Sequence, residues 1–255
     1  MGVLQNKVTI ITGASRGLGK ALAKRFSHEG STVALTGRSY DLMKEICHEI
    51  SISGGESYPV RMDVLDPKSI NNAVNETIER YGKVDVLINN SGIPMVSPSE
   101  SLSYENWKKT IDTNLTGVFL CSQAVAQHMI ERRTGGCIIN ISSSFGQSPV
   151  PQRAAYCSSK AAVNMLTRVL AAEWAEKNIR VNAIAPGYLN TEFIQQLEQQ
   201  GKLDMEPLKK RIPQRRIGNA EEITGLAVYM AGDEASYMTG SVVAIDGGWT
   251  AYGFI

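Results

Sequence analysis

Short apolar runs rich in β-branched residues recur along the chain, and stretches of helical character separate them. These runs lie at residues 7–12, 32–37, 58–64, 84–90, 137–143, 180–186 and 241–246. They lack the alternation of polar and apolar positions that marks a strand with one face in water, so both faces of each strand are expected to be buried. Buried strands separated by helices predict a doubly wound α/β fold, with a seven-stranded parallel sheet and helices on both faces.

The segments between the runs carry helix signals of their own. Residues 19–30 form one helix candidate, which ends at Gly30 as a helix with a C-terminal glycine does, and residues 154–178 form a longer one. No repeat, low-complexity tract or interdomain linker interrupts the pattern, so residues 1–255 are predicted to form a single domain. Residues 187–216 are irregular, rich in Gln and Lys, and contain Pro207 and Pro213. Because they follow the sixth strand, we expect them to form a lid over the ligand crevice.

The composition narrows the class of protein. The chain has 255 residues, of which 43% are hydrophobic and 20% charged, and its formal net charge is +1. Such a charge gives no reason to expect nucleic acid or an anionic membrane as a partner, and no apolar run approaches the roughly 20 residues that span a bilayer. The first residues lack the features of a secretory signal, so we expect a cytoplasmic protein. The four cysteines and three histidines are scattered without metal-ligand spacing, so no metal site is predicted.

A glycine cluster follows the first strand directly and opens a helix. Its glycines are Gly13, Gly17 and Gly19. Glycine lets the backbone approach a pyrophosphate closely, and the amides at the start of the following helix are free to bind it, which indicates a Rossmann-type dinucleotide site. A P-loop fails at two positions, because Ala14 takes the place of its first glycine and Ala21 that of its Ser or Thr. A purely structural turn remains the alternative.

The end of the second strand bears on the choice of dinucleotide. NAD sites usually place an acidic side chain there to bind the ribose 2′-hydroxyl. In this chain the strand ends in Thr36, Gly37 and Arg38, and the next carboxylate is Asp41. Arg38, with Arg16 from the glycine turn, can instead bind a 2′-phosphate through charge-assisted hydrogen bonds. We therefore predict NADP(H) as the cofactor and favour NAD(H) less; the alternative for both arginines is a solvated surface position.

A tyrosine and a lysine four residues apart suit the reduction of a carbonyl. The tyrosine can protonate the developing alkoxide if a neighbouring cation stabilises its phenolate, and a lysine one helical turn away supplies that cation. This Tyr-x-x-x-Lys pattern occurs three times, each with a serine thirteen residues before the tyrosine. The three copies are Tyr156 with Lys160 and Ser143, Tyr40 with Lys44 and Ser27, and Tyr104 with Lys108 and Ser91.

Position along the chain favours Tyr156. Tyr40 follows the second strand whereas Ser27 precedes it, so an extended segment of about 20 Å separates the two. Tyr104 has a suitable topology and remains the alternative, but Lys108 lies among charged residues where its charge would be screened. Tyr156 follows a strand-end serine and opens a helix of mainly Ala, Val, Leu and Ser. A lysine in so uncharged a helix is expected to be partly buried and to need a partner.

Polar residues at two further points complete a recognisable set. Asn114 stands within an apolar helix stripe, and Asn90, Ser91 and Gly92 form a small-residue turn after the fourth strand, features that singly are more often structural. The motifs TGASRGLG, NNSG, Asn114, Ser143, YCSSK and APGYLNT, in this order and spacing, make the chain resemble the short-chain dehydrogenase/reductase family along nearly its whole length. One departure is Ser91, where the family usually has alanine; it is small enough that no loss of binding is expected.

The resemblance implies a catalytic set of four residues. Tyr156 would be the acid/base, and Lys160 would lower its pKa while binding the nicotinamide ribose. Ser143 would hold the substrate oxygen, although a serine flanks it on either side and only the spacing selects it. Asn114 would anchor a water in a proton relay.

The resemblance also implies which residues contact the dinucleotide. Asp63 would bind the adenine, the turn at 90–92 would line the cofactor, and the segment 186–191 would hold the carboxamide. The predicted cofactor-binding residues are Gly13, Ser15, Arg16, Gly17, Leu18, Gly19, Arg38, Asp63, Val64, Asn90, Ser91, Gly92, Tyr156, Lys160, Pro186, Gly187, Leu189 and Thr191. The family usually forms tetramers, and the tail from Trp249 to Ile255 is apolar, so we expect a homotetramer whose interface buries that tail.

These features together predict an NADP(H)-dependent alcohol dehydrogenase or carbonyl reductase that acts on a small molecule. The family that the chain resembles includes sugar and polyol dehydrogenases as well as 3-oxoacyl reductases, and all share this core. A polyol, sugar or sugar acid is therefore ranked only slightly ahead of a 3-oxoacyl-[acyl-carrier-protein] or a general ketone as the substrate. A non-catalytic dinucleotide sensor is a distant alternative, since all four catalytic positions are occupied. An anionic substrate would suit the basic residues of the stretch 187–216, although a solvated helix face is the commoner reading. Those residues are Lys202, Lys209, Lys210, Arg211, Arg215 and Arg216.

Overall fold

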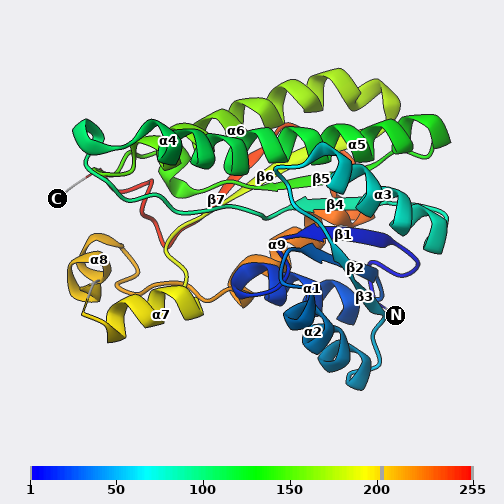
Figure 1. The fold of residues 1–255 in the computed structure, drawn as a ribbon, viewed down its shortest axis with the longest axis horizontal. Coiled ribbons are helices and arrows are strands. Elements are labelled where there is room, and N and C mark those ends of the chain that lie inside the picture. The colour runs from blue at the N-terminus through cyan, green and yellow to red at the C-terminus, as the bar shows by residue number, and fades with distance from the viewer. Residues whose placement is uncertain (1, 202–203, 254–255) are drawn as a thin grey trace.

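The computed structural model describes residues 2–201 and 204–253, and within these ranges the predicted strands form one parallel sheet (Figure 1). The strands are β1 (Val8–Thr12), β2 (Thr32–Gly37), β3 (Ser57–Arg61), β4 (Val86–Asn89), β5 (Gly136–Ile141), β6 (Ile179–Pro186) and β7 (Val242–Ile245). Their order is β3-β2-β1-β4-β5-β6-β7, and every neighbouring pair is parallel. The predicted doubly wound fold is confirmed. The chain direction across the sheet reverses at β1 and β4, so a crevice is expected beyond their carboxyl ends.

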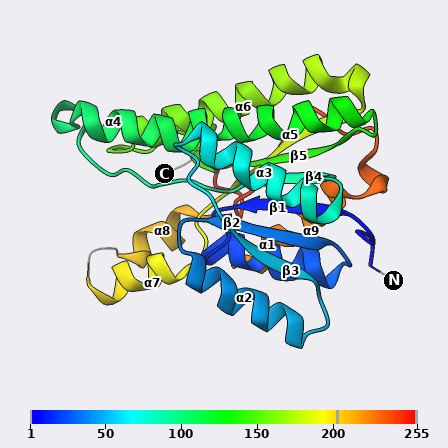
Figure 2. The ribbon, with the colours of Figure 1, turned by 45° about the vertical axis from the view of Figure 1, so that its right-hand side comes forward.

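Helices cover both faces of this sheet. The helices are α1 (Gly17–His28), α2 (Tyr40–Ile52), α3 (Pro67–Tyr81), α4 (Tyr104–Ile111), α5 (Gly117–Arg132), α6 (Ala154–Trp174), α7 (Glu192–Gln199), α8 (Met205–Arg211) and α9 (Glu221–Ala231). Figures 1 and 2 show α1, α2 and α9 on one face and α3, α5 and α6 on the other. No helix within the described ranges is both long and apolar enough to cross a membrane.

The core consists of two apolar layers, one on each side of the sheet. Ile11 and Ile88 pack into the layer under α1 and α9, whereas their neighbours Ile10 and Leu87 pack into the layer under α3, α5 and α6. All four side chains are buried. Successive strand residues point to opposite faces, so a strand covered on both sides is apolar at most of its positions. This requirement explains the continuous apolar runs in the sequence.

The stretch 187–216 is less irregular than the sequence indicated, because it contains α7 and α8. Thr191 caps α7 by accepting a hydrogen bond from the Ile194 amide at 3.4 Å, and Asp204 caps α8 by accepting one from the Glu206 amide at 3.0 Å. Pro207 lies in the first turn of α8, where the missing amide costs nothing. In Figures 1 and 2 both helices lie beyond the carboxyl ends of the central strands.

Candidate active site

Two adjoining cavities open at the carboxyl edge of the sheet. The nucleotide cavity, of about 480 Å³, is lined by the glycine turn after β1, the end of β2, the loop after β3 and part of α4. The reaction cavity, of about 550 Å³, is lined by the ends of β5 and β6 and by the start of α6. Asn90, Gly92 and Ile93, in the turn after β4, line both cavities. The two therefore form one continuous groove.

The glycine turn has a backbone geometry that favours glycine. Gly13 has a φ of +66°, and a Cβ there would lie 3.0 Å from Ser91 Oγ. A Cβ at Gly19 would lie 2.3 Å from the Gly13 carbonyl oxygen. Helix α1 begins at Gly17, and no side-chain hydrogen bond caps its N-terminus at Arg16. Its first amides are therefore available to an anion, and the close-packed turn lets the anion approach them.

Thr12 ties the glycine turn to the turn after β4, and the sequence reasoning missed it. Its Oγ1 accepts hydrogen bonds from the Asn90 amide at 3.0 Å and the Ser91 amide at 2.9 Å. The Asn90 side-chain amide donates to the carbonyl oxygens of Thr12 and Gly13, at 3.0 and 3.1 Å. Asn90 thus holds two turns of the groove together. The sequence signal that could have identified Thr12 is a hydroxyl residue at the carboxyl end of a buried strand, directly before the glycine turn.

The nucleotide cavity is predominantly cationic. Arg16, Arg38 and Lys109 line it, and none of the three forms an ion pair within the described residues. Asp63 is the one carboxylate among its described lining residues. Asp41, the carboxylate closest in sequence to Arg38, does not line the cavity and pairs with a lysine of α2. The cavity therefore suits an anion at the end of β2.

Most of the predicted site residues line one of the two cavities. Those of the nucleotide cavity are Gly13, Ser15, Arg16, Leu18, Gly19, Arg38, Asp63, Val64, Asn90, Ser91 and Gly92. Those of the reaction cavity are Leu18, Asn90, Gly92, Ser143, Tyr156, Lys160, Pro186, Gly187, Leu189 and Thr191. Gly17 and Asn114 line neither, although both lie beside residues that do. Segments from six strand ends, those of β1 to β6, thus meet at one edge.

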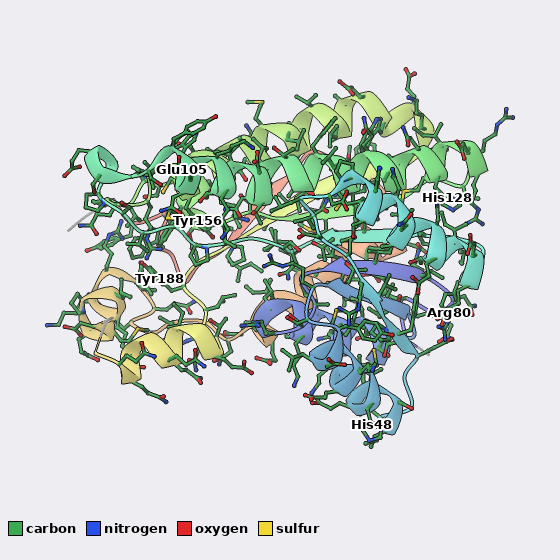
Figure 3. The ribbon with its side chains drawn as sticks, viewed as in Figure 1. His48, Arg80, Glu105, His128, Tyr156 and Tyr188 are labelled. Carbon is green, nitrogen blue, oxygen red and sulfur yellow. The ribbon has the colours of Figure 1, made fainter. Side chains whose placement is uncertain are left out.

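Tyr156 lies in the first turn of α6 and shares the reaction cavity with Ser143. Figure 3 shows it with Tyr188 on the side of the molecule where α7 and α8 lie, away from His48 and His128. Burial raises the pKa of Tyr156, while the Ser143 side chain and the charge of Arg153 act in the opposite direction. The net direction is opposite to the lowering that the family resemblance implies, because burial dominates. The phenol is therefore protonated at neutral pH in this structure, as an acid must be.

Lys160 is buried, with 3% of its surface exposed. Its Nζ donates a hydrogen bond to the Ile141 carbonyl oxygen at 2.7 Å and lies 5.8 Å from the centre of the Tyr156 ring. Burial lowers the pKa of this lysine to about 8. The sequence predicted a buried lysine with a partner, and both features are confirmed; the partner is the backbone at the end of β5. A Cβ at Gly92 would lie 3.6 Å from Nζ, so the ammonium faces the turn after β4.

Asn114 lies in a π-helical turn, Asp112–Thr116, between α4 and α5. Its side-chain amide donates to the Ile93 carbonyl oxygen and to Ser159 Oγ, both at 3.1 Å, and its Oδ1 accepts from the Ile93 amide at 2.8 Å. Single π-helical turns occur frequently at functional sites. These bonds fix the loop after β4 and link it to α6 one residue before Lys160. The water-anchoring role stays a prediction.

The three consecutive serines after β5 have different surroundings. Ser142 Oγ donates to Asn164 Oδ1 at 2.5 Å, so its proton is already used. Ser144 Oγ is buried without a partner among the described residues and does not line the reaction cavity. Ser143 Oγ lines the cavity, accepts a hydrogen bond from the amide of Phe145 at 3.1 Å, and its side chain also hydrogen-bonds with Tyr156. The geometry therefore favours Ser143 as the donor to a substrate oxygen.

The other two Tyr-x-x-x-Lys copies lie outside the groove. Lys44 Nζ lies 5.0 Å from the centre of the Tyr40 ring, at the start of α2. Tyr104 is 71% exposed, and Lys108 forms an ion pair with Asp112. None of these residues lines either cavity. Location rather than pattern separates Tyr156 from its two sequence equivalents.

An aromatic cluster packs beside the reaction cavity, and the sequence reasoning did not identify it. The Phe145 and Tyr188 rings, which line the cavity, have centroids 5.3 Å apart. Trp249 lies 5.9 Å from Phe145 and 5.7 Å from Tyr188, and the Arg211 guanidinium lies 4.7 Å above its ring. The expectation that a second subunit covers the tail is wrong for Trp249, which is 8% exposed and covered by its own chain. Residues 254–255 of that tail lie outside the described residues.

The described basic residues of the stretch 187–216, which are Lys209, Lys210, Arg211, Arg215 and Arg216, do not line the reaction cavity. Lys209 pairs with Glu206 at 3.0 Å, and Arg216 pairs with Glu222 at 2.7 Å. Lys202 lies outside the described residues. Carboxylates of the chain itself therefore engage two of the five described basic residues. Lys210, Arg215 and Arg216 are exposed, as the solvated-face reading expects, whereas Arg211 is partly buried against Trp249.

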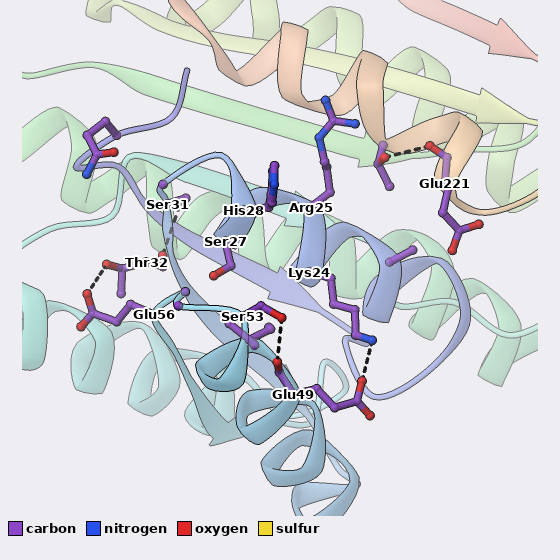
Figure 4. A pocket seen from close by; sticks show the side chains of 17 residues that line it. Lys24, Arg25, Ser27, His28, Ser31, Thr32, Glu49, Ser53, Glu56 and Glu221 are labelled. Carbon is purple, nitrogen blue, oxygen red and sulfur yellow. Dashed lines mark hydrogen bonds and ion pairs between the residues drawn. The ribbon is translucent and has the colours of Figure 1, made fainter. Parts of the chain in front are cut away.

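A larger cavity, of about 700 Å³, lies at the opposite edge of the sheet between α1, α2 and the start of β3 (Figure 4). Its charged groups are largely satisfied within the chain: Lys24 pairs with Glu49 at 2.5 Å, and the Thr32 hydroxyl donates to Glu56 at 3.0 Å. It contains neither the glycine turn nor the Tyr156 cluster. Within the described ranges, no group of His, Cys, Asp or Glu is arranged to hold a metal ion.

Comparison with known proteins agrees with this geometry. The family described as enoyl-(acyl carrier protein) reductase matches residues 13–250. The chain is 39% identical over 252 residues to 3beta-hydroxysteroid dehydrogenase 1 of Eggerthella lenta, covering 98% of this chain and 95% of that protein. It is 38% identical to the 3-oxoacyl-[acyl-carrier-protein] reductase FabG of Thermotoga maritima, covering 96% and 98%, respectively. It is 37% identical to glucose 1-dehydrogenase 2 of Bacillus subtilis, covering 98% and 96%.

Solved structures resemble the fold over the same length. A short-chain type dehydrogenase/reductase from Mycobacterium marinum is 38% identical, with a TM-score of 0.92, and the match covers 98% of this chain and 97% of that one. A gluconate 5-dehydrogenase from Burkholderia cenocepacia, in complex with NADP and tartrate, is 32% identical with a TM-score of 0.92 and the same coverage.

Proposed function

The chain belongs to the short-chain dehydrogenase/reductase family, and on this premise we propose that it transfers a hydride between NADP(H) and an alcohol or carbonyl carbon. The observation that carries the proposal is the meeting of Ser143, Tyr156 and Lys160 in one cavity that adjoins an uncapped helix N-terminus. The family binds a nicotinamide dinucleotide, which supplies or accepts the hydride when it is bound.

The nucleotide cavity fits such a cofactor. The space that a Cβ at Gly13 or Gly19 would fill, together with the free amides of α1, suits a pyrophosphate. Arg16 and Arg38 are exposed cations without ion-pair partners in the described part of the chain, and Arg38 directly follows β2. We assign to them the 2′-phosphate of NADP(H), and to Asp63 the adenine. NAD(H) is less favoured because no carboxylate stands at the end of β2.

Tyr156 is proposed to move the proton. In carbonyl reduction its hydroxyl gives a proton to the substrate oxygen as that oxygen gains negative charge, and in alcohol oxidation the phenolate takes it back. The Ser143 hydroxyl, which lies beside the phenol, donates a hydrogen bond to the same substrate oxygen and so fixes it there. The ammonium of Lys160, held by the Ile141 carbonyl, keeps a positive charge near the phenolate. Asn114 holds the loop after β4 against α6 and thereby keeps Lys160 in place.

The substrate is proposed to be a polyol, sugar or sugar acid. Support comes from the likeness to a glucose dehydrogenase and to a gluconate 5-dehydrogenase whose structure contains NADP and tartrate. A 3-oxoacyl-[acyl-carrier-protein] or a general ketone is the alternative, which the likeness to FabG supports. The stretch 187–216 is proposed to act as a lid, because Tyr188, Leu189 and Thr191 line the reaction cavity. A single domain, a homotetrameric assembly and a cytoplasmic location complete the proposal.

One panel of assays tests this function. Polyols, sugar acids, ketones and 3-oxoacyl esters are assayed with NADP(H) and NAD(H), on the wild type and on Tyr156→Phe. We expect turnover with at least one class, faster with NADP(H), and a loss of about 10²- to 10⁴-fold in Tyr156→Phe with little change in NADPH affinity. Tyr104→Phe, in the exposed copy of the pattern, is the matched control and should keep full activity.

Two outcomes would overturn the proposal. Retained turnover in Tyr156→Phe would remove this residue as the proton donor. Tight NADPH binding with no turnover across the panel would instead favour a non-catalytic dinucleotide sensor.

A further inference from the structure

Arg153 is a cation in the reaction cavity that has no partner among the described residues. It lies at the N-terminal end of α6, three residues before Tyr156, and is half-buried. No ion pair or hydrogen bond engages its guanidinium within the described residues, and no Asp or Glu is among the described residues that line the cavity. A partly desolvated guanidinium normally has an anionic or polar partner.

The other cation of the cavity is already engaged. Lys160 is buried and donates to the Ile141 carbonyl oxygen, so Arg153 is the charge available to a molecule in the cavity. Arg153 lines the same cavity as Tyr156 and Tyr188, and its positive charge opposes the rise that burial causes in the pKa of both phenols. The hydroxyl of Tyr188 likewise has no hydrogen-bond partner among the described residues. A cation and two phenol hydroxyls thus face one space.

Most of the other surface that lines the cavity is apolar. Phe145, Tyr188, Met95, Val96 and Ile194 line the cavity together with Arg153. A guanidinium against apolar surface forms stronger charge-assisted hydrogen bonds than one in open water, since less solvent competes for its donors. A single planar guanidinium matches one planar carboxylate with two parallel hydrogen bonds.

We propose that Arg153 is a specificity-determining residue that binds a carboxylate of the substrate, so that the substrate is a hydroxy acid or the corresponding oxo acid. The inference rests on the hydride transfer proposed above and narrows its substrate to the acid class. In the oxidative direction the carbinol carbon would lose a hydride to NADP⁺, its hydroxyl proton would pass to the phenolate form of Tyr156, and the oxo acid, NADPH and the neutral phenol would result. The carboxylate itself is unchanged; Arg153 holds it close to the carbon that reacts.

Matched substrates make the test specific. Glycerate, threonate and gluconate are each compared with glycerol, threitol and glucitol, which differ by a hydroxymethyl group in place of the carboxylate. We expect the wild type to favour at least one acid over its neutral partner in kcat/KM. Arg153→Gln should raise KM for that acid by about 10- to 100-fold, with a smaller change in kcat. The KM values for NADP⁺ and for the neutral partner should change less than threefold, and Arg153→Lys should recover part of the loss.

Binding separates this inference from the proposed function. In the complex saturated with NADPH a hydroxy acid cannot be oxidised, so calorimetric titration of the acids and polyols measures affinity whether or not the protein turns over. Acid-selective binding that Arg153→Gln removes would support the carboxylate site even if no turnover were found. Equal binding of acid and polyol, or an acid preference that survives in Arg153→Gln, would overturn it. Arg168→Gln, an exposed arginine farther along α6, is the control for folding and net charge.

Discussion

Lys160 lies with its ammonium 5.8 Å from the centre of the Tyr156 ring, and its hydrogen bond goes to the backbone carbonyl of Ile141 rather than to the phenol. The lysine therefore lies beside the tyrosine as a buried charge, and its recorded hydrogen bond is to the backbone. Burial also lowers the pKa of Lys160 to about 8, so its charge is lost at a lower pH than that of an exposed lysine. This buried charge has a cost in stability that can be measured.

The first prediction concerns stability and pH. The pKa of Lys160 is about 8 in the folded protein, against 10.5 for an unperturbed lysine. Between these values the unfolded chain binds more protons than the folded one, so the free energy of unfolding should rise with pH. From pH 8 to 10 the rise is about 2 kcal/mol, and this group contributes no slope below pH 7. Urea unfolding of the cofactor-free protein measures it.

The contribution of Lys160 is isolated by substitution. Lys160→Met should lack this rise, whereas Lys177→Met, which removes an exposed lysine after the same helix, should follow the wild type. Other groups that titrate above pH 8 cancel in the difference between the curves. Parallel curves for wild type and Lys160→Met would show that the buried ammonium carries no such penalty.

The second prediction concerns the choice of cofactor. Arg38 is exposed, follows β2 and lines the nucleotide cavity without an ion-pair partner in the described residues. Arg38→Gln should weaken NADPH binding by about tenfold or more, the loss typical of a hydrogen bond to a charged group, and leave NADH binding nearly unchanged. Fluorescence titration with both cofactors measures this. Lys44→Gln, outside the cavity, controls for net charge; an equal loss with NADPH and NADH would mean that Arg38 does not contact a 2′-phosphate.

The third prediction concerns the glycine turn. Gly19→Ala places a Cβ 2.3 Å from the Gly13 carbonyl oxygen and 2.7 Å from Asn90 Nδ2, so the turns after β1 and β4 must shift apart. We expect a loss of about 1–3 kcal/mol in stability and a larger proportional loss of cofactor affinity. Gly225→Ala, in α9 with open space around its Cα, should instead stabilise the protein by about 0.5–1 kcal/mol. Thermal unfolding with and without NADPH distinguishes these effects; equal behaviour of the two variants would contradict the packing argument.

The sheet was predictable from the sequence because each strand must satisfy the same requirement. Burial of both faces leaves few residue types at positions such as Ile10 and Ile11, so apolar runs identify the strands. In a parallel sheet all strands end at the same edge, and ligands bind there. The position of Ser143 at the end of a strand therefore indicated that it lies in the site. Local sequence, in contrast, does not determine which distant residues a segment near the end of the chain packs against. Trp249 lies at the end of the chain, and nothing near it in sequence indicates that it packs on Phe145.

Properties that depend on the balance between burial and charge were the least predictable in the site. The lysine spacing correctly indicated a buried Lys160, but the direction of the pKa of Tyr156 depends on how much water the folded chain excludes. The role of Thr12 depends on the approach of two turns separated by more than seventy residues. Arg153 could not be identified from the sequence, because a sequence does not show which charged side chains lack a partner in the fold. In the described part of the chain its guanidinium has none.

The fourth prediction concerns the contact between the end of the chain and the stretch 187–216. Trp249 packs on Tyr188, which lines the reaction cavity, and the Arg211 guanidinium at the end of α8 lies 4.7 Å above the Trp249 ring. Asp246 fixes the backbone that carries this tryptophan, because its carboxylate accepts hydrogen bonds from the amides of Gly248 and Thr250, each at 2.9 Å. The tail is thus a support for the segment that borders the substrate.

Trp249→Ala should therefore loosen α8 and the Tyr188 wall more than the sheet. Truncating a buried tryptophan costs about 3–5 kcal/mol where the surroundings cannot collapse. Here the ring packs on the end of α8 and on the cavity wall rather than on either layer of the core. We expect faster hydrogen exchange and faster tryptic cleavage within 205–216, a raised KM for substrate and little change in the exchange of β1, β4 and β5. Tyr237→Ala, which removes a fully exposed ring, should change none of these. Uniformly faster exchange across the sheet in Trp249→Ala would instead show that the aromatic cluster supports the whole fold, because the effect would then not be confined to the elements that Trp249 touches.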